Sequence, residues 1–312
     1  MGRCDMRIEF VIVRLFILMS LSLSVCSGPA GAAESDTIVV NGQRLTKEEA
    51  RARATDFVRR LGVVQGDRPA ARWASRICLK VKGVSTDIAH IVETRMTSTI
   101  QAVGARAATG NCTTNLLVAF VSDGQELAAL VNERQPASMT DFQGPERREL
   151  LEGDAPVRWW YTIAYGSSDG DILSSTPSPV TSGNVEGGGS ILPDGVPTGG
   201  SYAPSLVRSQ VIRLIRAATV IIDVNRAEGI TLNAAADYAA FVGLAEVRRN
   251  SPVAVRSIIN LFSPEYGSES LTDWDLRFLT KLYTIPLNRL GRLQRGYLVK
   301  ALVDDGDIDE SE

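Results

Sequence analysis

The run VRWWYTIAY, residues 157–165, decides the fold class of this chain, because seven of its nine residues are aromatic or β-branched. Such residues favour a pleated, half-buried strand. Two runs downstream, residues 206–215 and residues 218–224 (ATVIIDV), are also predicted strands. A helical pattern follows over residues 232–248. Strands followed by helices predict an α+β fold.

The chain changes character directly after this first run. Of the 40 residues from 166 to 205, 26 are Gly, Ser, Pro or Thr, and none is Lys or Arg. Such a segment cannot bury enough apolar surface to offset the entropy of ordering it. We therefore expect a flexible Gly/Ser/Pro-rich insertion over residues 166–205, inside a C-terminal region of residues 155–303.

The end of this region reads as helical. We expect a short helix at residues 257–259, a helix over 272–283 that starts at a capping box, and a last helix over 287–303. Residues 304–312 hold six acidic side chains in nine and are expected to form a solvated tail.

Upstream, residues 37–150 alternate strand and helix patterns and are expected to form an N-terminal α/β-type region. Thr46 and Glu49 have the spacing of a capping box, which marks the start of a helix. Apolar spacing predicts the remaining elements. The predicted strands are 37–40, 76–81 and 115–121, and the predicted helices are 46–61, 85–103 and 125–133.

The first 32 residues have the three parts of a cleavable signal peptide. Arg3, Arg7 and Arg14 precede or flank a short apolar run, residues 15–25, and a small-x-small site ends at Ala32. The run is too short to span a bilayer as a helix, which needs ~20 residues. We expect a periplasmic or secreted protein; an uncleaved anchor or a lipid on Cys26 is the alternative.

The charge of the exported chain limits the classes of partner to expect, and its cysteines indicate a disulfide. The signal holds three of the 33 basic and two of the 36 acidic residues, which leaves 30 and 34. A weakly acidic chain gives no reason to expect nucleic acid or anionic lipid, and no later segment is apolar enough to cross a membrane. Cys78 and Cys112 remain after cleavage, and an oxidising compartment favours a disulfide between them over two buried thiols.

The chain offers little for catalysis, because His90 is its only histidine. A single histidine excludes any multi-histidine metal site, and its place on a predicted helix fits an ordinary surface residue. Residues 166–170 match the G-x-S-x-G nucleophile pattern, which requires a helix and a histidine after it. Neither follows, so we interpret this run as a turn and expect no cofactor.

The order of motifs after residue 157 resembles the zincins, specifically matrixin-like zinc peptidases and an exported family related to them. The matching features are a strand with Trp159 and Trp160, the strand at 218–222, the helix around Gly243 and a turn at 257–259. The closing helix matches the pattern L-T-x-x-D-x-x-x-L-x-x-L-Y from Leu271 to Tyr283. The resemblance covers about 145 residues and implies a zincin-like region.

In that register this chain lacks the zinc ligands of the family. Ala236 and Ala240 stand at the positions of the two zinc-binding histidines, and Asp237 stands at that of the catalytic glutamate. Gly243 matches the glycine of the pattern. Glu246 stands at the position of the third zinc ligand, and Ile259 at that of the methionine of the turn. Alanine cannot bind Zn²⁺. The resemblance therefore implies a degenerate domain without a metal, although the same residues also fit an ordinary buried helix.

Two classes of function remain. The first is a non-catalytic protein of the cell envelope with a binding or structural role, whose partner is a protein or peptide. In this class an extended peptide adds to an edge strand, for which the strand near Val220 is the candidate. The second is a peptidase-like hydrolase with an atypical site built on Asp237, Glu246 or His90. We favour the first class.

Overall fold

The computed structural model describes residues 46–139, 144–167, 207–209, 211–249 and 251–304. All of these described residues belong to one compact unit. The predicted signal (1–32), the strand at 37–40, nearly all of the insertion and the tail from residue 305 lie outside the described residues. Within the described ranges, no helix is long and apolar enough to span a bilayer.

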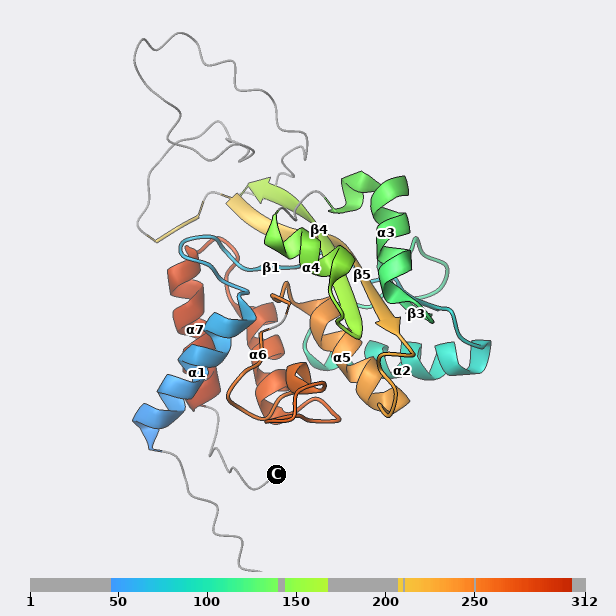
Figure 1. Cartoon of the computed structure of the whole chain (residues 1–312). Coiled ribbons are helices and arrows are strands. Elements are labelled where there is room, and N and C mark those ends of the chain that lie inside the picture. Colours follow the sequence, from blue (N-terminus) through green and yellow to red (C-terminus); the bar gives the residue numbers. More distant parts are fainter. Residues whose placement is uncertain (1–45, 140–143, 168–206, 210, 250, 305–312) are drawn as a thin grey trace, which may run out of the picture. The chain divides into compact units, whose positions relative to one another are not determined.

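Five strands form one mostly parallel sheet, and with the helices around it they confirm the α+β class (Figure 1). The strands are β1 (Ala71–Trp73), β2 (Leu79–Lys82), β3 (Leu116–Val121), β4 (Val157–Ser167) and β5 (Val211–Asp223). β5 is central. β1 and β3 pair with it in parallel, β4 pairs with it antiparallel along nearly its whole length, and β2 extends the sheet beyond β3.

β5 is one strand where the sequence predicted two. Arg216 and Ala217, at the expected break, are not turn-forming residues, and the chain runs through them without reversing. The irregularity lies instead in the pairing, since the register between β4 and β5 shifts between Thr162 and Ile163.

The pairing partners of Val220 show that β5 is not an edge strand. Val220 of β5 lies between Val118 of β3 and Trp159 of β4. The expectation that the strand near Val220 is an open edge is therefore wrong, because both of its sides are paired. Among the described residues β4 is paired on one side only, so β4 is the edge strand.

The two predicted regions build this sheet together. β1, β2 and β3 come from residues 37–150, whereas β4 and β5 come from residues 155–303. The segment between residues 150 and 155 is thus a boundary along the sequence but not in the sheet.

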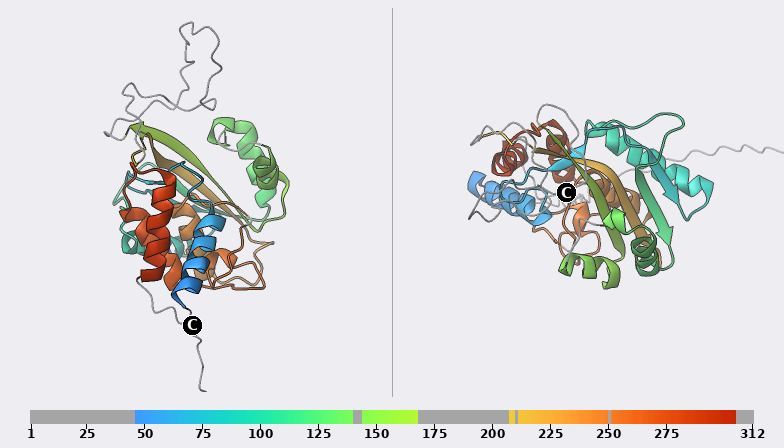
Figure 2. Two further views of the ribbon diagram at one scale, coloured as in Figure 1. Left: turned by 90° about the vertical axis from the view of Figure 1, so that its left-hand side faces the viewer. Right: turned by 90° about the horizontal axis from the view of Figure 1, so that it is seen from above.

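Helices cover both faces of the sheet (Figure 2). On one face Trp160 and Ile221 pack with Ala128 and Leu150. On the other face a larger core surrounds α5. The helices are α1 (Lys47–Leu61), α2 (Thr86–Ala102), α3 (Gly124–Arg134), α4 (Pro145–Glu152), α5 (Leu232–Leu244), α6 (Asp273–Thr284) and α7 (Gly291–Asp304), with 3₁₀ turns η1 (Pro136–Met139) and η2 (Ile258–Asn260).

Helix α5 is the centre of the larger core. Thr231 caps its first turn by accepting a hydrogen bond from the amide of Ala234, and every residue from Ala234 to Leu244 is buried. Its small residues allow close packing: a Cβ atom added at Gly243 would lie 3.1 Å from Leu116 Cδ1. The helix ends at Leu244, four residues before the predicted end.

Two helices have features that the sequence pattern did not predict. The buried side of α2 is formed by Val92, Met96 and Ile100, whereas the apolar Ile88 and Ile91 are exposed. Helix α4 was not predicted, because its sequence PERRELLE is mostly charged and only Leu150 is buried. Its start does follow a known rule, with Pro145 in the first turn.

The predicted disulfide between Cys78 and Cys112 is present, with an S–S distance of 2.03 Å. Cys78 precedes β2 and Cys112 precedes β3, so the bond ties together the starts of two neighbouring parallel strands. The Asn115 side chain supports the same corner, since its Oδ1 accepts a hydrogen bond of 2.7 Å from the Cys78 amide.

Candidate functional site

Two hollows lie one after the other along β4. The first, of about 390 Å³, contains Val157 and Trp159 in its wall; the second, of about 510 Å³, contains Tyr161 and Ile163. Both are also lined by Glu149, Arg248 and Arg249, so they adjoin. We call the two together the β4 groove.

The main chain of β4 is directed into the open side of this groove. In an antiparallel pair, alternate residues turn their N–H and C=O groups towards the partner strand and away from it. The Trp159 carbonyl accepts a hydrogen bond from the Arg249 side chain at 2.9 Å, so it is turned away from β5. Val157 and Tyr161 share this alternation, and their main-chain groups are turned to the same open side.

The first hollow is mainly apolar. Tyr238 of α5 lies between Trp159 and Phe262, with ring centroids 5.9 Å and 5.4 Å apart in edge-to-face arrangements. Phe262 is 37% exposed. Ile259, at the methionine position of the zincin pattern, also lines this hollow. The hollow therefore has an aromatic wall suited to an apolar side chain.

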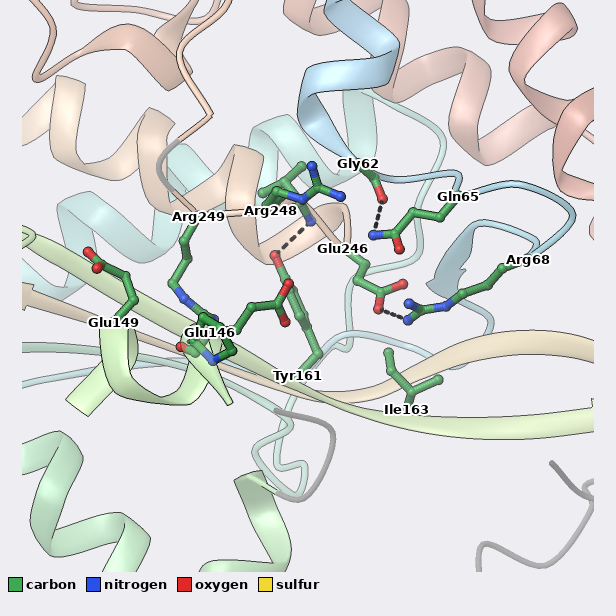
Figure 3. A pocket seen from close by; sticks show the side chains of 12 residues that line it. Gly62, Gln65, Arg68, Glu146, Glu149, Tyr161, Ile163, Glu246, Arg248 and Arg249 are labelled. Carbon is green, nitrogen blue, oxygen red and sulfur yellow. Dashed lines mark hydrogen bonds and ion pairs between the residues drawn. The ribbon is translucent and has the colours of Figure 1, made fainter. Parts of the chain in front are cut away.

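The second hollow is polar and charged (Figure 3). Its lining includes three positively charged and three negatively charged side chains. They are Arg68, Arg248 and Arg249, and Glu146, Glu149 and Glu246. Arg248 is exposed, and the described residues provide no hydrogen-bond or ion-pair partner for its guanidinium. An acidic group of a ligand would find an unpaired cation there.

Tyr161 fixes the floor of the second hollow. Its hydroxyl donates to the carbonyls of Val242 and Ala245, both at 2.7 Å, and accepts from the Val247 amide at 3.2 Å. Burial raises the pKa of this phenol well above its usual value. The hydroxyl joins β4 to the end of α5 and is not placed to exchange protons near neutral pH.

Glu246, at the third-ligand position, is held by two arginines. Its carboxylate accepts from Arg68 at 2.6 Å and from the buried Arg213 at 2.6 Å and 2.8 Å. The coulombic attraction and hydrogen bonds of Glu246 raise the pKa of Arg213 against the opposing effect of burial. Both carboxylate oxygens are thus occupied by ion pairs.

Asp237, at the position of the catalytic glutamate, is 3% exposed. Its two oxygens accept from Arg95 Nε at 2.6 Å and from the Arg95 terminal nitrogen at 2.7 Å, and one of them also accepts from the Leu271 amide at 3.1 Å. The hydrogen bonds that Arg95 donates to Asp237 raise the pKa of Arg95. This carboxylate joins α2, α5 and the segment before α6.

Ala236 and Ala240 belong to the buried core and line neither hollow, and the carbonyl of Gly243 accepts from Trp73 Nε1 at 2.8 Å. In the described ranges no three His, Cys, Asp or Glu residues are grouped so as to hold a metal ion. Of the six positions of the zincin pattern, only Glu246 and Ile259 line the groove, and they lie in different hollows.

His90 is exposed on α2 and lines neither hollow. A second buried carboxylate, Asp275, lies in the first turn of α6 and accepts from Ser257 Oγ at 2.5 Å and from the amides of Ile258 and Thr272 at 2.9 Å each. Burial outweighs these hydrogen bonds and raises the pKa of Asp275 to about 6. Ser257 and Asp275 are both fully buried, so the pair is structural.

Sequence reasoning missed the residues that shape the groove, namely Tyr161, Arg248, Arg249, Glu146 and Phe262. Their roles depend on which strand is the edge, which is decided by pairing between distant segments. One signal was available: the aromatic run at 157–165 alternates towards and away from the core, so it marks a strand with one face against α5.

No protein-family model, curated protein or solved structure matches this chain.

Proposed function

We propose that this protein is exported and binds, without cleaving it, an extended segment of a peptide or protein partner along the β4 groove. The observation that carries the proposal is the placement of two hollows in succession beside the outward main chain of an edge strand. An added strand would hydrogen-bond to β4, and its alternate side chains would enter the two hollows.

The side chains that line the two hollows indicate which residues of an added peptide strand would fit them. A side chain in the first hollow would contact Trp159, Tyr238 and Phe262, which favours an aromatic or branched apolar residue. The next side chain on the same face would reach the second hollow, where Arg248, which has no partner for its guanidinium among the described residues, favours an acidic or polar residue.

The side chains considered for catalysis are already engaged or lack reactive atoms, which supports a role in binding without catalysis. The carboxylates of Asp237 and Glu246 are engaged in ion pairs, and Ala236 and Ala240 offer no ligand atoms. General acid–base catalysis needs a side chain that is free to take up and release a proton beside the substrate. The proposal includes descent from a zincin-like domain, supported by the order β4, β5, α5, η2 and α6.

Retention of peptides by the immobilised protein tests this proposal. A pool of random N-acetylated octapeptide amides is passed over the protein, and retained peptides are identified by mass spectrometry. We expect enrichment of apolar residues two positions from acidic ones, and peptides of unchanged mass. Retention without preference, or cleaved peptides, would contradict the proposal.

A matched pair of variants locates the binding. Phe262→Ser removes one aromatic wall of the first hollow, whereas Tyr266→Ser removes a more exposed aromatic side chain of the same loop, 52% exposed, that lines neither hollow. We expect Phe262→Ser to lower retention about tenfold, and Tyr266→Ser to leave it unchanged. Equal effects of the two changes would place the binding elsewhere.

A further inference from the structure

Arg249 lies where the two hollows of the β4 groove meet, and it lines both. Figure 3 shows its side chain extending towards α4. One terminal nitrogen donates to the Trp159 carbonyl at 2.9 Å, and the other donates to the Glu146 carbonyl at 2.9 Å. The side chain thus crosses the groove from the segment after α5 to both β4 and the start of α4.

The Trp159 carbonyl is one of the groups that an added strand needs. A peptide paired with β4 would donate a main-chain N–H to this outward carbonyl, as in any antiparallel or parallel ladder. The Arg249 guanidinium occupies that acceptor and the space beside it. The arrangement described here and a peptide strand along the whole groove therefore exclude each other.

Keeping Arg249 in this place has a free-energy cost. Both of these acceptors are neutral main-chain carbonyls, and burial lowers the pKa of the guanidinium, although nearby Glu146 and Glu149 oppose the shift. A lowered pKa means that the surroundings hold the positive charge less well than water does. Release of the side chain to solvent recovers hydration, which offsets part of the loss of these hydrogen bonds.

We propose that Arg249 is a latch on the β4 groove: it covers the edge carbonyl of Trp159 in the free protein, and a peptide strand enters only when it swings out. This inference rests on the proposed function and adds its regulation. The latch also protects the free edge strand from pairing with other chains, a hazard that exposed edges carry.

The test compares Arg249→Met with the unchanged protein in the octapeptide retention assay. Methionine keeps an unbranched apolar stem of similar reach but cannot donate to either carbonyl. We expect the variant to retain about tenfold more peptide, which is the ratio that one such hydrogen bond is worth. Arg256→Met is the control, because Arg256 is exposed and lines neither hollow; it should retain as much as the unchanged protein.

Each result separates the latch from the proposed function. Equal retention by Arg249→Met and the unchanged protein, above an empty support, overturns the latch and leaves peptide binding intact. Lower retention also overturns it and makes Arg249 a contact for the peptide. Retention by none of the proteins removes the proposed function and the latch with it.

Arg249→Lys keeps the test decisive if the methionine variant does not fold. Lysine retains the charge but lacks the planar fork that reaches two carbonyls at once. We expect retention between those of the unchanged protein and Arg249→Met. Retention no higher than that of the unchanged protein would overturn the latch.

Discussion

The Asp237 carboxylate and the Arg95 guanidinium form a two-point ion pair at 2.6 Å and 2.7 Å that joins α5 to α2. Asp237 is buried, whereas the Arg95 side chain is 37% exposed. Loss of one partner therefore has unequal consequences. A free Arg95 can hydrate, but a free Asp237 stays in the core as an uncompensated charge.

This asymmetry gives the first prediction. Arg95→Met should lower the free energy of unfolding by about 3 kcal/mol, and Asp237→Ala by about half as much. Urea denaturation of both variants measures the difference. The double variant should be no less stable than Arg95→Met alone, since it carries no unpaired charge. A smaller loss for Arg95→Met than for Asp237→Ala would contradict this account.

The second prediction concerns the disulfide. Reduction, or the double change Cys78→Ala and Cys112→Ala, opens a loop that spans 34 residues of sequence. By the loop-closure argument, the free energy of unfolding should fall by about 4 kcal/mol. Denaturation with and without reductant gives the value, and thiol titration of the denatured, unreduced protein should find no free thiol. Two titratable thiols would show that the bond is absent.

The third prediction is a pH dependence from Asp275. Its pKa is raised from 3.8 to about 6 in the folded protein, so the folded state favours the protonated carboxyl. The protonated Asp275 therefore contributes its full stabilisation to the folded protein below pH 3.8, the pKa of the unfolded state, and this contribution is lost as the pH rises through about 6. Relative to Asp275→Asn, the unchanged protein should lose on the order of 3 kcal/mol between pH 4 and pH 7.

The comparison with Asp275→Asn isolates this one group, because both proteins share all other titrating residues. Thermal unfolding at half-unit steps from pH 4 to pH 7 supplies the curves. The free energy of unfolding of the unchanged protein minus that of Asp275→Asn should fall as the pH rises. A constant difference, or one that grows with pH, would show that the carboxyl is not destabilised by burial.

Local patterns predicted most elements of the fold. The capping boxes at Thr46 and Thr272 each begin a helix, and the aromatic run at 157–165 forms β4. These signals lie within a few residues of the structure that they predict. The disulfide was predicted from the two cysteines that follow the predicted signal.

What the sequence could not predict depends on distant contacts. Val220 has the same β-branched neighbours whether its strand is central or at an edge, so only its pairing with Val118 and Trp159 decides the matter. Arg249 resembles any other arginine until the Trp159 carbonyl is placed beside it. The groove was missed for that reason.

Amide hydrogen exchange across residues 157–163, with and without saturating amounts of the best-retained octapeptide, tests the central claim most directly. If a peptide strand adds to β4, the amides of Trp159 and Tyr161 should exchange more slowly in its presence, while the peptide keeps its mass. Unchanged exchange at these two amides, protection confined to another surface, or cleavage of the peptide would contradict the claim.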